Sequence, residues 1–266
     1  MTHPTPTPAT PDELRMLPPG HPSRRIPLDG TFNFRDVGGY PSERLGSLRA
    51  GALYRSDALG DLTESDRGVL SDLGVQTVID LRESAEIASY PDRLDGLAIL
   101  EVHVPVFEDS LFAGSYEHLT EPMTLEGLYD EMLTVRARQL ATAVETLGAP
   151  EGRFPAVVHC TAGKDRTGVV VAMLLGALDV PLQWIVDDFA ATELFLGPAF
   201  VKRIEEHYRR NGFPASMAAS PTRAPASLMS ASLQRVTDEY GTVEGFLLGH
   251  GATRASLDRI RNALAG

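Results

Sequence analysis

The chain has 266 residues, of which 43% are hydrophobic, enough to bury one large core or two small ones. Acidic residues outnumber basic ones, 36 to 24, and the formal net charge of −12 argues against non-specific binding of nucleic acid. No apolar segment is long enough to span a bilayer, and the N-terminus lacks the pattern of a secretory signal. The single cysteine, Cys160, excludes an intrachain disulfide and fits a reducing compartment. We therefore expect a cytoplasmic protein, or one exported without a recognisable signal peptide.

The N-terminal stretch, residues 1–23, is rich in Thr and Pro and carries few large apolar residues. This composition is typical of a disordered leader. The folded part is expected to begin near Arg24 and to form a single domain over residues 24–266. Within it, residues 31–40 and 53–58 predict two short strands.

Further along, the pattern alternates between helices and strands. Thr63 caps a predicted helix that Gly74 closes, and residues 75–82 predict a buried parallel strand. Asp80 falls at the carboxyl end of that strand, the edge of an α/β sheet where ligands bind. There follow a strand within 97–106, a helix over 124–147, a strand over 155–159 and a helix over 167–178. This order predicts an α/β fold with a mainly parallel central sheet flanked by helices.

The C-terminal third is predicted to be helical. Residues 182–195 and 198–210 form two helical patterns that are unusually apolar for a peripheral element, and an Ala-, Ser- and Pro-rich loop over 211–227 follows. Further helices are predicted over 228–240, 243–249 and 255–265. The chain contains no internal repeat, metal-ligand spacing or dinucleotide fingerprint, so neither a cofactor nor a metal is expected.

The turn between strand 155–159 and helix 167–178 carries the clearest functional signal. A helix start leaves backbone N–H groups unpaired and carries the positive end of the helix dipole, so this turn can hold an anion. Arg166 can clamp two phosphate oxygens, and Cys160 in the same field is expected to be a thiolate nucleophile. The predicted phosphate-binding residues are Thr161, Ala162, Gly163, Lys164, Asp165 and Arg166.

Three residues of the turn are expected to support this chemistry. The hydroxyl of Thr167 can bond the sulfur and favour its departure, and the ring of His159 can orient the loop. Gly163 lets the backbone turn with its N–H groups inward. The alternative is a buried cysteine that merely packs. Packing alone does not account for the charged residues 164–166 beside it.

The string from His159 to Gly168, His-Cys-x5-Arg-Thr-Gly, resembles the signature of the cysteine-dependent protein tyrosine phosphatase superfamily. More narrowly, it resembles the bacterial and mycobacterial tyrosine and dual-specificity phosphatases. Asn-Phe-Arg-Asp-x-Gly-Gly, from Asn33, and Tyr-Arg-Ser-Asp, from Tyr54, resemble the same family, so the resemblance covers most of the chain. It implies a protein tyrosine phosphatase fold and hydrolysis of phosphomonoesters through a phosphocysteine intermediate.

The two N-terminal stretches contain four charged residues: Arg35, Asp36, Arg55 and Asp57. One interpretation is that they support the phosphate loop from behind. The other is an ion-pair network that fixes the N-terminal strands. The resemblance also implies a helical lid, within 187–235, that folds over the pocket and shields the thiolate from water and oxidants. Ordinary core contact is the alternative for these helices.

A phenol leaving group has a pKa of about 10, so its oxygen needs a proton from a general acid as the P–O bond breaks. The chain has no Trp-Pro-Asp loop, and its one tryptophan, Trp184, is not followed by proline. Asp165, inside the loop, is the first candidate for the acid, and Asp80 is the second. The alternative for Asp165 is an ion pair that positions Lys164 or Arg166.

Phosphotyrosine-containing proteins are the expected partners, because a recessed thiolate favours a long aromatic phosphoester. Lys164 adds positive charge and resembles the pattern of phosphatases that also accept phosphoinositides; simple neutralisation of Asp165 is the alternative. Side activity on phosphoserine, phosphothreonine and phosphoinositides is therefore expected. Two rival functions are a catalytically silent module that binds phosphorylated partners and sulfur transfer by the loop cysteine, which accounts less well for Arg166 and Thr167.

Overall fold

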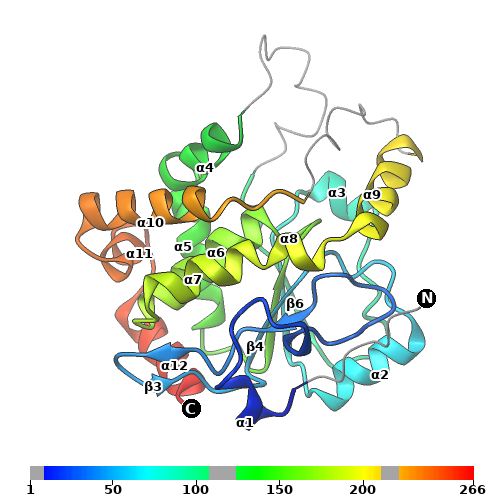
Figure 1. Ribbon diagram of the computed structural model, residues 1–266, viewed down its shortest axis with the longest axis horizontal. Helices are drawn as coiled ribbons and strands as arrows, with labels where there is room; N and C mark the ends of the chain where they lie inside the picture. Colours follow the sequence, from blue (N-terminus) through cyan, green and yellow to red (C-terminus); the bar gives the residue numbers. More distant parts are fainter. Residues whose placement is uncertain (1–8, 108–123, 211–221) are drawn as a thin grey trace.

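The computed structural model describes residues 9–107, 124–210 and 222–266 (Figure 1). Its centre is a five-stranded sheet with the strand order β1-β4-β7-β5-β6. All neighbouring strands are parallel except β1 and β4, which are antiparallel. The strands are β1 (Arg35–Asp36), β4 (Leu53–Ser56), β7 (Ala156–His159), β5 (Thr77–Asp80) and β6 (Leu100–His103). The predicted α/β fold with a mainly parallel sheet is confirmed.

The central strand β7 is buried on both faces, as a parallel strand covered by two layers should be. Its side chains alternate: Val158 joins the larger hydrophobic cluster, and Val157 joins the smaller cluster on the other face. The neighbouring β5 does the same with Ile79 and Val78. The helix α6 (Asp165–Ala177), which follows β7, is buried along most of its length and lies in the larger cluster.

Helices cover both faces of this sheet. The larger cluster is built mainly by α6 and by α4 (Leu125–Thr134), α5 (Ala137–Leu147), α7 (Leu182–Ala190), α10 (Ala226–Tyr240), α11 (Val243–Gly249) and α12 (Arg254–Leu264). The other face is covered by α2 (Glu64–Asp72). The structure also contains α3 (Ser84–Ser89), α8 (Thr192–Phe195), α9 (Pro198–Arg210) and the hairpin of β2 (Pro41–Ser42) and β3 (Gly46–Ser47). Among the described residues, no helix is both long and apolar enough to cross a membrane.

The predicted helix over 124–147 is broken into α4 and α5. Arg136 leaves the helical conformation, with φ −104° and ψ 11°, and its backbone N–H donates to the carbonyl oxygen of Glu131. Its guanidinium also lies 3.2 Å from the carboxylate of Glu131. The period of apolar residues continues through the break, so the sequence pattern does not reveal it.

Part of the predicted leader is structured. Residues 9–23 include α1 (Pro11–Leu14) and most of the 3₁₀ turn η1 (Pro22–Arg24), whereas residues 1–8 lie outside the described part. The Arg24 side chain is buried and donates hydrogen bonds to the carbonyl oxygens of Leu14 and Gly38. These contacts hold residues 9–23 against the domain, which differs from the disorder that their composition predicts.

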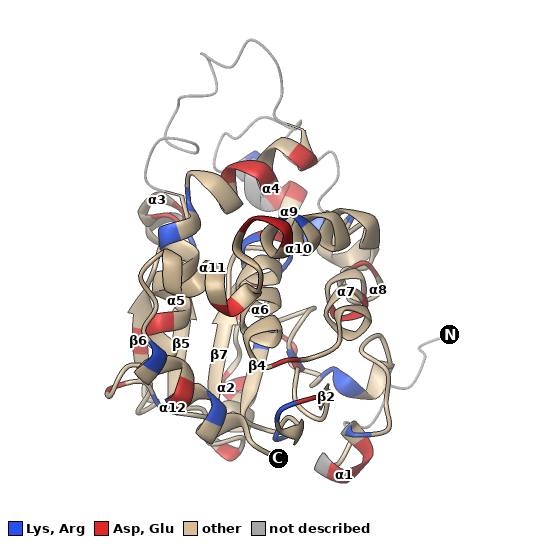
Figure 2. Ribbon diagram, turned by 90° about the vertical axis from the view of Figure 1, so that its left-hand side faces the viewer, with Lys and Arg blue, Asp and Glu red and all other residues tan. Residues whose placement is uncertain are grey.

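The carboxyl ends of three strands meet at one edge of the sheet. Ser56 at the end of β4 and Asp80 at the end of β5 both lie opposite His159 at the end of β7. The helices α3, α4 and α9 lie beyond this edge, as the side view in Figure 2 shows. The predicted functional turn starts here.

Candidate active site

The loop 160–164 connects β7 directly to α6. Gly163 has φ +64°, and a Cβ on it would lie 2.1 Å from the carbonyl oxygen of Ser56, so only glycine fits this position. The side chain of Cys160 lies at the base of the loop and is buried, with 2% of its surface exposed. Cys160 thus directly follows β7 and begins the loop that leads to the N-terminus of α6.

Arg166 in the first turn of α6 forms an ion pair with Glu86 of α3. Its two terminal nitrogens lie 2.5 and 2.9 Å from the two carboxylate oxygens. The hydroxyl of Thr161 donates a hydrogen bond to the same carboxylate. Burial alone would raise the pKa of Glu86, but the charge and hydrogen bonds of Arg166 outweigh burial and lower the pKa to about 2. A carboxylate thus orients the arginine that is expected to clamp phosphate.

Replacing Glu86 with Gln should destabilise the protein near neutral pH by about 1–3 kcal/mol, because Arg166 loses a charged partner. The pKa of Glu86 in the fold, about 2, lies below its ordinary value of 4.5. The pair therefore stabilises the fold above pH 4.5, and this contribution is lost as the pH falls toward 2. Denaturant unfolding of both proteins near neutral pH and at about pH 3 should show a shrinking difference. A difference independent of pH would contradict the assignment; the exposed Glu205→Gln is the control.

Asp165, which was predicted to lie inside the loop, is the first residue of α6 and is partly exposed. One carboxylate oxygen accepts a hydrogen bond of 3.1 Å from the hydroxyl of Tyr129, and the other lies 3.6 Å from Nζ of Lys164. Its side chain keeps 24% of its surface exposed, so it can face a leaving group. The buried ring of Tyr129 packs edge-on against Phe189 of α7, which fixes the hydroxyl that holds Asp165.

Asp80 has a different environment. Both of its oxygens accept hydrogen bonds from the guanidinium of Arg82. Burial raises the pKa of Asp80, but the charges of His159 and Arg82 outweigh burial and lower the pKa to about 2. Asp80 is thus a carboxylate held in an ion pair.

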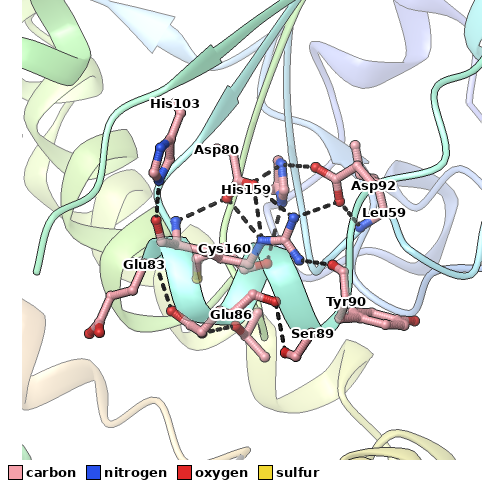
Figure 3. Close-up of polar contacts among 12 residues, drawn as sticks. Leu59, Asp80, Glu83, Glu86, Ser89, Tyr90, Asp92, His103, His159 and Cys160 are labelled. Carbon is pink, nitrogen blue, oxygen red and sulfur yellow. Dashed lines mark hydrogen bonds and ion pairs between the residues drawn. The ribbon is translucent and has the colours of Figure 1, made fainter. Parts of the chain in front are cut away.

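His159 stands between two carboxylates (Figure 3). Its Nε2 lies 3.1 Å from Asp92 and 3.9 Å from Asp80. Burial would lower the pKa of His159, but the charges of Asp92 and Asp80 outweigh burial and raise the pKa to about 9. The three side chains have the composition of a metal-ligand set. Arg82 already contacts both carboxylates, so this cluster is a charge-compensated ion network behind the loop.

Thr167, the other predicted supporting residue, is fully buried in the first turn of α6. In the described part of the chain its hydroxyl has no hydrogen-bond partner, so the predicted bond to the sulfur is not formed here. Glu86 and Asp92 carry no motif signal. Their roles depend on partners distant in sequence, such as Arg166, which lies 80 residues from Glu86.

The charged residues of the N-terminal strands differ in how they reach the loop. Arg55 donates to the carbonyl oxygen of Gly163, and Asp57 accepts from the backbone N–H of Asn33. Arg35 pairs with the buried Asp188 of α7. Asp36 instead accepts hydrogen bonds from two backbone N–H groups, those of Gly38 and Gly51. Three of the four therefore lie in the network around the loop, and Asp36 stabilises a turn.

The helix α9 and Leu196 just before it contact the phosphate loop. Leu196, Phe200 and Ile204 form a small apolar cluster. It packs against Phe32 and against Ala162 of the phosphate loop. The rings of Phe32 and Phe200 meet edge-on at 5.7 Å. Leu196 and α9 therefore pack against the loop at Ala162.

A sequence profile described as the tyrosine phosphatase family matches residues 26–266. The chain is 31% identical to the triple specificity protein phosphatase PtpB of Mycobacterium tuberculosis, over 90% of this chain and 98% of that protein. It is 30% identical to a tyrosine-protein phosphatase of Nostoc commune, over 83% of this chain and 76% of that protein. The solved structure of P. aeruginosa TpbA is 19% identical, with a TM-score of 0.36 over 64% of this chain and 87% of that one. The profile and the two relatives show that the chain belongs to the tyrosine phosphatase family.

Proposed function

We propose that the protein hydrolyses phosphotyrosine in proteins through a phosphocysteine intermediate. The observation that carries this proposal is the placement of Cys160 at the start of the loop and of Arg166 in the first turn of the helix that follows it, with the turn between them fixed at Gly163. This arrangement offers a nucleophile and a clamp for the same phosphoryl group. Nucleophilic attack by Cys160 and binding of the phosphoryl group by Arg166 require no cofactor.

In the first step, the thiolate of Cys160 attacks phosphorus in line, and the P–S bond forms as the P–O bond to the leaving group breaks. The leaving oxygen takes a proton from the carboxylic acid of Asp165. In the second step, water attacks phosphorus and gives its proton to the carboxylate of Asp165. The P–S bond then breaks and returns the thiolate and free phosphate.

The direct test is turnover of p-nitrophenyl phosphate and of a phosphotyrosine peptide by the purified full chain. Release of phosphate from both is expected. Tight binding of the phosphopeptide without release of phosphate would instead indicate a silent binding module and would contradict the proposal.

Asp165→Asn should lower kcat for phenyl phosphate by about 10² to 10⁴, the usual contribution of general acid catalysis. The effect on p-nitrophenyl phosphate should be much smaller, because its leaving group needs little protonation. Asp80→Asn should affect both substrates equally, since Asp80 is paired with Arg82. If the loss of kcat depends on the leaving group only in Asp80→Asn, Asp80 is the general acid. If it depends on the leaving group in neither variant, neither residue is the general acid.

Lys164 is expected to influence the preference between phosphoinositide and phosphopeptide substrates. Its buried ammonium lies 3.6 Å from Asp165, beside the loop. A phosphoinositide carries more negative charge than phosphotyrosine, so Lys164→Ala should lower lipid hydrolysis about tenfold more than peptide hydrolysis, a difference of about 1.4 kcal/mol. A panel of phosphotyrosine, phosphoserine, phosphothreonine and phosphoinositide substrates at matched ionic strength checks this. An equal loss on all substrates would favour simple neutralisation of Asp165.

We also propose that part of the predicted lid, residues 187–235, covers the pocket; residues 211–221 of it lie outside the described structure. The contacts of Leu196 and Phe200 with the phosphate loop region support this role. Leu194, by contrast, is 72% exposed and contributes nothing to the cover.

A further inference from the structure

Three successive carbonyl groups of the phosphate loop are held from behind. The backbone N–H of Ala58 donates 3.1 Å to the carbonyl oxygen of Thr161. The side-chain amide of Asn33 donates to the carbonyl oxygens of both Ala162 and Gly163, at 3.1 Å each. Asn33 is therefore a side chain that bridges two consecutive peptide groups of the loop.

These bonds decide where the opposite sides of the peptides point. In a planar trans peptide the C=O and the next N–H point in opposite directions. Fixing the carbonyls of Ala162 and Gly163 toward Asn33 therefore turns the N–H groups of Gly163 and Lys164 away from it. With φ +64° at Gly163, consecutive N–H groups converge into an anion-binding nest. Among the described residues, the N–H of Gly163 donates no hydrogen bond, so it is available to an anion.

The amide of Asn33 is itself held in one orientation. Its Oδ1 accepts a hydrogen bond from the guanidinium of Arg35, which leaves Nδ2 to face the loop. Its backbone N–H donates 2.9 Å to Asp57, and the residue is fully buried. Arg35 and Arg55 in turn share the carboxylate of Asp188. The side-chain amide of Asn33 is thus held in place by four buried side chains, directly by Arg35 and Asp57 and indirectly by Arg55 and Asp188.

We propose that Asn33 is a positioning residue for the reaction, which keeps the loop N–H groups directed at the phosphoryl oxygens. The inference rests on the proposed function. It adds the requirement that a residue far before Cys160 in the sequence, Asn33, donates hydrogen bonds to the back of the loop. Donors aimed at the phosphoryl oxygens hold the bound phosphate and stabilise the charge that develops in the transition state still more, so the loss in kcat/KM without Asn33 should exceed the loss in phosphate affinity.

The test compares Asn33→Asp with Asp36→Asn. Asn33→Asp keeps the size and an acceptor for Arg35 but replaces the donor to Ala162 and Gly163 by an oxygen. Asp36→Asn changes a buried residue three positions along, whose bonds go to Gly38 and Gly51 and not to the loop. Asn33→Asp should lower kcat/KM for p-nitrophenyl phosphate at least tenfold, and by a larger factor than it weakens phosphate binding, whereas Asp36→Asn should lower only the melting temperature.

A second arm does not depend on turnover. In a Cys160→Ser background, binding of inorganic phosphate measured by calorimetry should weaken at least tenfold with Asn33→Asp and remain unchanged with Asp36→Asn. If Asn33→Asp does not fold, Asn33→Ala gives the same comparison without the added charge. Equal phosphate affinity in the Asn33 variant and the control would overturn the inference. If the wild-type protein is inactive but its phosphate binding still depends on Asn33, the proposed function is rejected and the inference about Asn33 is not.

Discussion

Cys160→Ser is expected to lower kcat for p-nitrophenyl phosphate by about 10⁴ or more, the scale of losing a covalent nucleophile. A serine hydroxyl at this position is not ionised at neutral pH and is a poor leaving group in the second step. The replacement changes one atom at a buried position, so the loop and its contacts should remain.

The control for Cys160→Ser is its affinity for inorganic phosphate. Arg166 and the loop N–H groups do not depend on the sulfur, so Cys160→Ser should bind inorganic phosphate at least as well as the wild type. Calorimetry and steady-state kinetics on the same preparation check both expectations. Turnover within tenfold of the wild type would rule out Cys160 as the nucleophile.

Arg166→Lys is expected to lower kcat/KM for p-nitrophenyl phosphate by about 10² to 10³, as for removal of one donor to a developing oxyanion. Lysine keeps the positive charge but cannot present two parallel N–H groups to phosphate. It also cannot make the paired contacts, 2.5 and 2.9 Å, that Arg166 makes with Glu86. The loss should therefore exceed what charge alone would explain.

The matched control is Arg235→Lys, on the outer surface of α10. Arg235 pairs with Asp130 and keeps 44% of its side chain exposed. Exposed pairs of this kind contribute about 0–1 kcal/mol to stability, so its activity and stability should stay close to those of the wild type. Similar kinetics for Arg166→Lys and this control would contradict the role of Arg166.

The local part of the site could be predicted from the sequence. The strand, the turn with Gly163 and the following helix lie within one continuous stretch, residues 156–177, and each appears within two residues of its predicted bounds. Asp80 also lies at the predicted strand end. Its partner Arg82 is only two residues away, yet the ion pair could not be inferred, because the direction of a side chain depends on burial.

The non-local part could not be predicted. Glu86, Asp92 and Asp188 act on the loop through partners on other elements; Asp188, for example, contacts Arg55 across 133 residues. Their placement follows from the order of the strands and from how α3 and α7 pack, and neither leaves a periodic or motif signal in one sequence. The same holds for Arg24, which holds residues 9–23 through carbonyl oxygens that no composition rule identifies.

The mechanism requires that the phosphoryl group is transferred to the sulfur of Cys160 before phosphate is released. The measurement that tests it most directly is acid quenching of the wild type and of Asp165→Asn within the first turnover of p-nitrophenyl phosphate, followed by mass spectrometry of the peptide that contains Cys160. We expect phosphate on Cys160 in both proteins, together with a burst of nitrophenol that matches the enzyme concentration if the second step limits turnover. The phosphorylated fraction should be larger in Asp165→Asn, because that variant lacks the base for the second step. Rapid turnover with the Cys160 peptide unmodified at every quench time would contradict the mechanism.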